Sequence, residues 1–402
     1  MVAYQEFVSL SQSQVSEDRG SAAHLSAHAY LNHIGPADEH AALYAALIGF
    51  LDDPSVKVRA ALAYGLLHSN EAPRPIMLAL LHDSAIIARA VIQYSPVLID
   101  ADLIGLIKTL DLSMLVAVSQ RSKMSPRLAA AIIARGQGAV TQRLLRRHDI
   151  ALGEALLTQL ATDLADEAEM RGALLARRDL PAAARLLLVQ KVTQALRGAR
   201  IVKGALTSDR LERVLRDSGD TALTAIGERE AVQAKGGYVS ELIVTDRVNT
   251  RVLLHAVVTG HVMFFADCLA ELAQAPRSKV FTLLENGSRP ALNALFVRCG
   301  LAEGVRNLLA RLVLHARSSD LADDAGARHY VVTALTEELI AEHDGVIPEE
   351  LEEAFAYLSE QNILLARKAA RGVMAAFAMD TSSAMPALPG ERTVPRLALP
   401  AA

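Results

Sequence analysis

An aspartate and an arginine six residues apart occur twice near the start of the chain. Asp53 and Arg59 lie in FLDDPSVKVRAALAYGLL, and Asp83 and Arg89 keep the same spacing in LLHDSAIIARAVIQYSP. A single pair of this kind would suit a proton donor beside an anion clamp. Recurrence at a fixed interval favours a scaffold instead, because catalysis needs one site rather than a row. We therefore predict that the four residues form a structural ladder, in which losing one partner of a buried pair costs ~3–5 kcal/mol.

A second candidate site is rich in arginine. No acidic residue occurs between Leu112 and His148, although this stretch contains seven lysines and arginines. On one side of a helical array, such residues would form a positive surface for an acidic protein segment, a nucleic-acid backbone or an anionic lipid head group. The predicted partner-binding residues are Arg121, Arg127, Arg143, Arg146, Arg147, Arg177 and Arg178, with Arg185 from the next unit.

Two considerations limit this hypothesis. No Phe, Tyr or Trp lies between Tyr94 and Tyr238, so the stretch offers no aromatic ring on which a base could stack. The arginines can also pair with acids of adjoining helices, such as Asp149 and Glu169, and leave an ordinary solvated face. The solvated face is the simplest interpretation, and among partners an acidic protein segment ranks ahead of nucleic acid.

The other reactive residue types do not form a recognisable catalytic pattern. Four histidines near the start have spacings that can chelate zinc, but the HExxH pattern is missing and no carboxylate lies among the first three. The chain has no GxSxG elbow, and neither Cys268 nor Cys299 sits in a reactive setting. The histidines are His24, His28, His33 and His40. We expect no catalytic residue, no bound metal and no cofactor.

The composition favours helices over sheet. Hydrophobic residues make up 51% of the 402 residues, mostly Ala and Leu, whereas aromatic residues make up 4% and Trp is absent. No apolar run approaches the ~18 residues needed to cross a bilayer, and the opening residues lack a signal-peptide pattern. We expect a soluble, cytoplasmic protein, whose net charge of -4 gives no overall attraction to nucleic acid.

The two aspartate–arginine pairs belong to an internal repeat of thirty residues. Fainter copies follow, with restarts at Met124, Ile150 and Leu180 that are 26 and 30 residues apart. Short helical segments with short connections at this interval predict helical hairpins stacked into an α-solenoid. The chain is therefore expected to be all-α.

The repeat fades after about residue 225, where Gly236 and Gly237 indicate a joint. In the helices beyond it, one of Phe264 and Phe265 is expected to face the core while the other stays partly exposed. The predicted organisation is a flexible N-terminus (1–20), an α-solenoid (21–225), a linker (226–248), a C-terminal helical domain (249–380) and a disordered tail (381–402).

Residues 43–96 resemble HEAT-type repeats, in which an Asp-Pro turn precedes the second helix and an arginine follows the aspartate by six residues. The resemblance implies that Asp53, Arg59, Asp83 and Arg89 form a ladder of hydrogen-bonded charges between neighbouring repeats. The copies here are more compact than HEAT units of ~40–47 residues, and Ser84 stands in the second copy where the first has Pro54.

A longer stretch, residues 40–317, resembles a bacterial family known as domain of unknown function 2336. The resemblance rests on LLHDSAIIARAVIQYSPVLIDADLIGLI, ARRDLPAAARLLL, TGHVMFFADCLAEL and GSRPALNALFVRCGL. It implies an α-solenoid fold and no known activity.

These observations predict a non-enzymatic helical-repeat scaffold or regulator that binds a protein partner through its arginine-rich face. A HEAT-like nucleic-acid binder and a metal-dependent enzyme are the alternatives. Whether two copies of the chain form a homodimer is left open.

Overall fold

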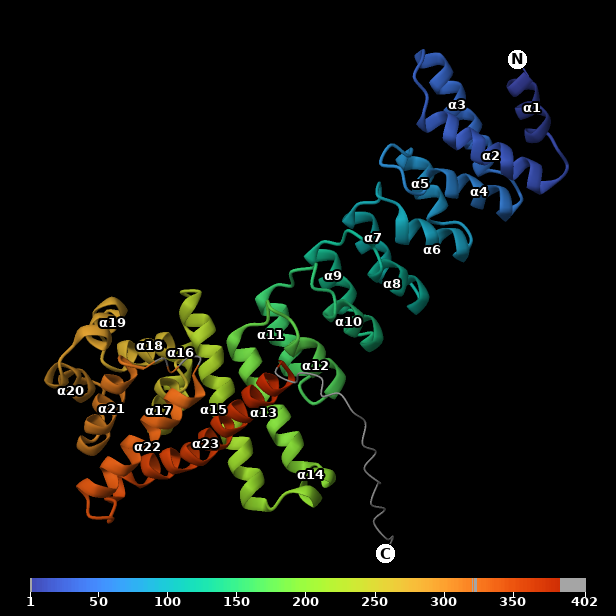
Figure 1. The fold of residues 1–402 in the computed structure, drawn as a ribbon. Coiled ribbons are helices and arrows are strands. Elements are labelled where there is room, and N and C mark those ends of the chain that lie inside the picture. Colours follow the sequence, from blue (N-terminus) through green and yellow to red (C-terminus); the bar gives the residue numbers. More distant parts are fainter. Residues whose placement is uncertain (1, 320, 322–323, 384–402) are drawn as a thin grey trace, which may run out of the picture. The chain divides into compact units, whose positions relative to one another are not determined.

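The computed structural model describes residues 2–319, 321 and 324–383, with side chains from residue 5 to residue 375 within these ranges (Figure 1). Over this part of the chain the structure is all helical, with 23 helices and no strand. The predicted all-α fold class is therefore confirmed. None of the described helices is both long enough and apolar enough to span a bilayer.

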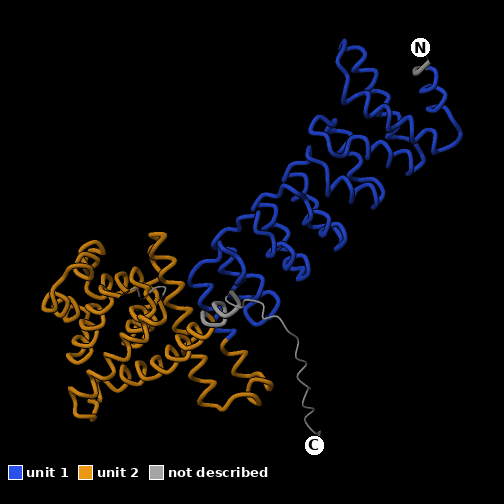
Figure 2. The backbone as a smooth tube through the Cα atoms, viewed as in Figure 1, with its two compact units in different colours: residues 1–192 blue, residues 193–402 orange. Residues whose placement is uncertain are grey.

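The chain divides into two compact units, residues 1–192 and 193–402 (Figure 2). This boundary corrects the predicted organisation in two places. Residues 1–20, expected to be flexible, contain a helix and the start of a second one. Residues 226–248, expected to be a linker, lie inside unit 2, because their helices pack against Val262–Leu272. Most of the predicted tail, residues 384–402, lies outside the described residues.

Unit 1 is built from short helices joined by short turns. They are α1 (Val2–Ser11), α2 (Ser16–Leu31), α3 (Ala37–Leu51), α4 (Val56–Leu66), α5 (Arg74–Leu80), α6 (Ala85–Tyr94), α7 (Asp100–Ile107), α8 (Leu112–Ser119), α9 (Pro126–Ile133), α10 (Gly138–Leu145), α11 (Glu154–Asp163) and α12 (Ala168–Leu175). Helix α13 (Ala182–Gly198) begins in unit 1 and ends in unit 2.

Within unit 1 the helices stack as pairs in a row, as an α-solenoid requires (Figure 1). In the row of second helices, α4 contacts α6, α6 contacts α8, α8 contacts α10 and α10 contacts α12, and α2 contacts α4. Each presents apolar residues at a spacing of four, as Val58, Leu62 and Leu66 do in α4, and these side chains are buried. A single pair cannot bury both of its faces, so each pair depends on its neighbours.

Unit 2 contains longer helices. They are α14 (Arg200–Ala205), α15 (Ser208–Val232), α16 (Tyr238–Val244), α17 (Thr250–Val258), α18 (Val262–Leu272), α19 (Arg277–Asn286), α20 (Arg289–Arg298), α21 (Glu303–Ala316), α22 (Ala325–Glu342) and α23 (Glu349–Ser383).

Helix α17 is the centre of unit 2. Every residue from Arg251 to Val258 is buried, and the helix contacts α15, α18, α21 and α23. Phe264 and Phe265 of α18 are both buried, so the expectation that one stays partly exposed is wrong. The reason is Gly227 of α15: a Cβ there would lie 2.1 Å from the ring of Phe264, so the glycine leaves room for that ring.

Candidate functional site

Ion pairs between successive repeats link the beginning of unit 1. The Nε atom of Arg19 lies 2.8 Å from a carboxylate oxygen of Asp53, and the Nε atom of Arg59 lies 2.6 Å from Asp83. Each guanidinium donates two hydrogen bonds to its carboxylate, the geometry in which such pairs are strongest. Arg59 also donates to the backbone carbonyl of Asp53 at 2.7 Å. Each arginine thus bonds to the aspartate of the following repeat.

Arg89 does not continue this ladder, which corrects its predicted role. Its side chain is exposed, and in the part of the chain that the structure describes it makes no ion pair. Thirty residues after Asp83 the sequence has Ser113, and the nearby Asp111 already accepts a hydrogen bond from the N–H of Met114 at the start of α8. The next repeat therefore has a serine at the position where the ladder would need its aspartate.

Substitution of these two arginines should separate their roles. Arg59→Ala is expected to lower the free energy of unfolding by about 2–3 kcal/mol, because it leaves the Asp83 carboxylate mostly buried without its partner. Arg89→Ala should change it by less than ~0.5 kcal/mol. Urea unfolding of both variants measures the difference, and equal losses would refute the assignment.

A different arginine contact joins the later repeats. Arg121, Arg147 and Arg177 each follow a second helix and donate to backbone carbonyls at the end of the preceding second helix and in the turn after it. Arg121 donates to the carbonyls of Ile92, Ser95 and Leu98. Arg147 donates to those of Ser119, Arg121 and Ser122. Arg177 donates to those of Leu145, Arg147 and Ile150. We call Arg121, Arg147 and Arg177 the arginine braces.

The arginine braces supply hydrogen-bond donors that the C-terminal ends of helices need. The last carbonyls of a helix lack intrahelical partners, and the helix dipole makes this end negative. A guanidinium carries five N–H donors and a positive charge, so it can satisfy several such carbonyls at once. Arg177, only 1% exposed, also pairs with Asp179 at 2.6 Å, which neutralises its charge. Arg121 is 7% exposed, and burial lowers the pKa of its guanidinium.

The braces correct three of the predicted partner-binding residues. Arg121 and Arg177 are buried, and Arg147 is half-buried with its donors engaged, so these three do not form a binding surface. Arg185 likewise donates to the carbonyls of Leu175 and Arg177. Among the predicted residues, the exposed ones are Arg127, Arg143, Arg146 and Arg178.

An open groove is lined by residues of α6 and α8. Its volume is about 780 Å³, and its lining includes Ile86, Tyr94 and Leu112, whose side chains are 70%, 50% and 51% exposed. Exposed apolar side chains that gather around a concave surface are typical of interaction sites. Arg89, the arginine left out of the ladder, also lines this groove.

The helices that line the groove carry no acidic residue, although the exposed Asp111 immediately precedes α8. Helices α6, α8 and α10 contain no Asp or Glu, and they contact one another in sequence. Arg143 and Arg146 lie 26 residues after Ala117 and Gln120 of the groove, the same interval that separates the braces Arg121 and Arg147. They therefore occupy the corresponding positions one helix further along. We call the exposed side chains of α6, α8 and α10, with Gln120 and Arg146 at their ends, the acid-free face.

The arginines of this face do not pair with a carboxylate in the described structure. Among the described residues, Arg89, Arg143 and Arg146 make no ion pair and no side-chain hydrogen bond. At the border, Glu169 of α12 accepts a hydrogen bond from Gln142 at 2.7 Å. The acid-free face therefore combines an apolar groove with three exposed guanidinium groups.

The histidines near the start pack as aromatic rings. His24 stacks on Tyr64, with ring centroids 5.6 Å apart, and His40 packs against Tyr30 at 4.4 Å. In the described part of the chain, no three His, Cys, Asp or Glu residues come together in a way that could hold a metal ion. Burial raises the pKa of both cysteine thiols, that of Cys299 to about 11, which disfavours the reactive thiolate.

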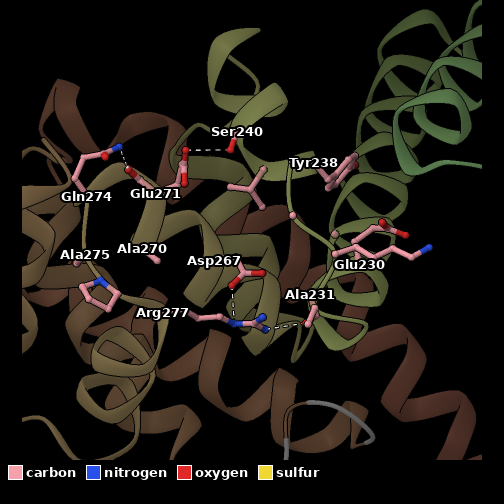
Figure 3. Close-up of a pocket in the computed structure, with 17 residues that line it drawn as sticks. Glu230, Ala231, Tyr238, Ser240, Asp267, Ala270, Glu271, Gln274, Ala275 and Arg277 are labelled. Atoms are coloured by element: carbon pink, nitrogen blue, oxygen red, sulfur yellow. Dashed lines mark hydrogen bonds and ion pairs between the residues drawn. The ribbon is translucent and has the colours of Figure 1, made fainter.

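Unit 2 contains a cleft of about 560 Å³ between the ends of α15 and α18 (Figure 3). Asp267 pairs with Arg277 at 2.7 Å, and Arg277 also donates to the carbonyl of Ala231. Ser240 donates to Glu271 at 3.0 Å. The cleft has the size of a small-molecule site, but its central charges compensate one another.

A buried polar cluster joins three helices of unit 2. Arg251 of α17 pairs with Asp217 and Asp220 of α15 at 2.6 and 2.7 Å, and with Glu360 of α23 at 3.1 Å. Its guanidinium lies 5.0 Å from the ring centre of Tyr357, a cation–π distance. Burial raises the pKa of Asp217 and Asp220, although Arg251 acts in the opposite direction.

The same cluster holds a neutral histidine. The hydroxyl of Tyr357 lies 3.1 Å from Nδ1 of His255, and Thr221 lies 3.2 Å from its Nε2. Burial lowers the pKa of His255 to about 4, so the ring is uncharged at neutral pH. The polar side chains named in this cluster all make an ion pair or a hydrogen bond with one another, which ties α15, α17 and α23 together. None of them is left as a free nucleophile.

Comparison with known proteins gives one match. A family model described as an uncharacterised protein conserved in bacteria, DUF2336, matches residues 87–346, which is more than half of the chain. The chain belongs to the DUF2336 family. No curated protein and no solved structure matches it. The DUF2336 match covers the acid-free face except for Ala85 and Ile86, and it covers most of unit 2, whereas the likeness of the first repeats to HEAT units stays a prediction.

The groove and the Arg251 cluster were not predicted from the sequence. A signal for the groove was present, because Ile86 and Tyr94 occupy the exposed positions of a helix that otherwise buries its apolar residues. No local signal existed for the cluster, since its members lie far apart in the sequence, from Asp217 to Glu360.

Proposed function

We propose that this member of the DUF2336 family is a non-enzymatic helical-repeat adaptor that binds an acidic, amphipathic segment of a protein partner along the acid-free face. One observation carries the proposal: the groove at Ile86, Tyr94 and Leu112 opens beside three uncompensated arginines on helices without acidic residues. Apolar side chains of the partner would fill the groove, and its carboxylates would pair with Arg89, Arg143 and Arg146.

A nucleic-acid role has less support. The burial of Arg121 and Arg177 removes two cations from the surface on which such a role would depend. The exposed aromatic residue of the groove is Tyr94, and Tyr64 and Tyr94 are the exposed rings on α4 and α6. A few separate rings do not form the stacking platform that single strands need.

The proposal is tested by selecting peptides from a display library of fragments of the source genome on the purified protein. We expect the selected segments to be enriched in Asp and Glu, with apolar residues at helical spacing. Affinity is then measured by fluorescence anisotropy. Arg143→Glu with Arg146→Glu should weaken binding at least about tenfold, as should Ile86→Asp.

Arg127→Glu is the control for a single charge reversal outside the acid-free face, because Arg127 is exposed at the start of α9, a first helix. Its affinity should stay within about twofold of the natural protein. Selected peptides without acidic enrichment, or peptides that bind the double variant and the control equally well, would contradict the proposal. Tighter binding to a DNA duplex than to any selected peptide would favour the nucleic-acid role instead.

A further inference from the structure

Helix α23 has two parts with different surroundings. In the first part, Leu351, Ala354 and Leu358 are buried at helical spacing, and the helix contacts α17, α21 and α22. Leu365 is the last residue of α23 that is buried among those whose side chains are described. From residue 366 to residue 375 every side chain is exposed or half-exposed. The helix therefore continues for several turns beyond the core of unit 2.

The exposed part of α23 is amphipathic, although it covers no apolar core. With ~100° of rotation per residue, five apolar residues fall within a sector of about 100°. Among them, Ile363, Val373 and Met374 are 58%, 55% and 70% exposed. The five residues are Ile363, Ala366, Ala370, Val373 and Met374.

A basic sector lies directly beside the apolar one. Arg367, Lys368 and Arg371 occupy the next ~100° of the helix, a sector that they share with Leu364, which is 44% exposed. Among the described residues none of the three makes an ion pair or a side-chain hydrogen bond, and all are exposed. No Asp or Glu occurs between Glu360 and Asp380, so the segment carries an uncompensated positive charge. We call residues 363–375 the basic segment.

We propose that the basic segment binds the surface of an anionic lipid bilayer, lying parallel to it. An apolar sector flanked by lysine and arginine is the pattern of interfacial helices, whose apolar side chains enter the boundary region while the basic ones contact anionic head groups. The apolar side chains here stand on a single convex helix rather than around a groove. A flat bilayer accommodates such a stripe without the matching pocket that a protein partner would need.

This inference is independent of the proposed function, because it concerns unit 2 and a different type of partner. It is tested by co-sedimentation of the full chain with vesicles of phosphatidylcholine containing 30% phosphatidylglycerol, at low salt. Each basic residue near an anionic surface contributes roughly fivefold to partitioning. Arg367→Glu with Arg371→Glu should therefore reduce the partition coefficient at least about 25-fold, and Val373→Asp with Met374→Asp should also reduce it.

Arg200→Glu with Lys203→Glu, two exposed positions on α14, is the charge-matched control and should bind like the natural protein. Because all substituted residues are exposed, circular dichroism and the urea midpoint should not change. Binding should fall steeply between 50 mM and 500 mM NaCl.

The proposal is overturned if the natural protein fails to bind the anionic vesicles at low salt. It is equally overturned if pure phosphatidylcholine vesicles bind as well, or if both charge-reversed proteins bind alike. Binding to poly-glutamate without binding to vesicles would replace the lipid with an acidic protein partner.

Discussion

Replacement of Arg177 with methionine is expected to lower the free energy of unfolding by about 3–5 kcal/mol. Methionine keeps an unbranched side chain of similar length, so the change removes the guanidinium while leaving little empty volume. The carbonyls of Leu145, Arg147 and Ile150 then lose their donor inside the structure. Each buried polar group without a partner costs ~1–3 kcal/mol. The loss is measured by urea unfolding at neutral pH.

Arg143→Met is the matched control, since Arg143 lies on the neighbouring α10 and is exposed without an ion pair in the described residues. It should change the free energy of unfolding by less than ~0.5 kcal/mol. Arg177→Lys should recover only part of the loss, because a single ammonium group cannot reach three carbonyls and a carboxylate. If Arg177→Met unfolded like the natural protein, Arg177 would be a surface residue after all.

Replacement of Arg251 with methionine is expected to have a comparable effect in unit 2, about 3–5 kcal/mol at pH 7. It leaves Asp217, Asp220 and Glu360 close together without their cation. Repulsion and poor solvation then oppose the packing of α15, α17 and α23. Arg247→Met provides the control, because Arg247 is exposed in the same unit.

The effect of Arg251→Met should depend on pH. The pKa of Asp217 and of Asp220 is already raised in the folded protein, so the folded state binds more protons than the unfolded state as the pH approaches these values. Without Arg251 both pKa values rise further, and stability falls with increasing pH over a wider range. The difference in free energy between variant and natural protein should therefore shrink from pH 7 to pH 5.

Comparing the two proteins at each pH removes most of the opposite contribution of His255. Its folded pKa of about 4 lies below its ordinary value mainly because the ring is buried, so acidification below pH 6.5 destabilises both proteins. Arg251 also lowers this pKa, so the variant loses less stability on acidification and the difference shrinks in the same direction. A difference that stays constant or grows on acidification would show that the three carboxylates are not the source of the loss.

Local repetition explains which parts of the fold could be predicted from the sequence. The thirty-residue interval and the turn at Asp53 indicate stacked helical pairs. Both can be read from the sequence because each depends only on residues that are close together in the chain. The boundary between the units could not be predicted in the same way. It falls inside α13, a helix without any break in sequence, whereas the conspicuous Gly236 and Gly237 only separate α15 from α16 inside unit 2.

The prediction that buried and exposed arginines share one binding surface is wrong for a physical reason. A stretch without Asp or Glu leaves its arginines exposed and unpaired only if carboxylates are the only groups that can accept their hydrogen bonds. Arg121 and Arg147 instead donate to carbonyls at helix ends, and such acceptors are present in every sequence. Their spacing was the available signal, because it equals the repeat interval and so places one arginine after each second helix. Exposed residues such as Arg143 do not lie just after the end of a second helix, because Arg143 lies within α10.

We propose that Arg89, Arg143 and Arg146 of the acid-free face bind a partner, whereas the arginine braces hold the repeats together. The most direct test is the affinity of a selected acidic peptide for Arg143→Glu with Arg146→Glu, measured by anisotropy beside Arg127→Glu. The account predicts at least about tenfold weaker binding for the double variant and affinity within about twofold of the natural protein for the control. Equal affinity of the two proteins would contradict it.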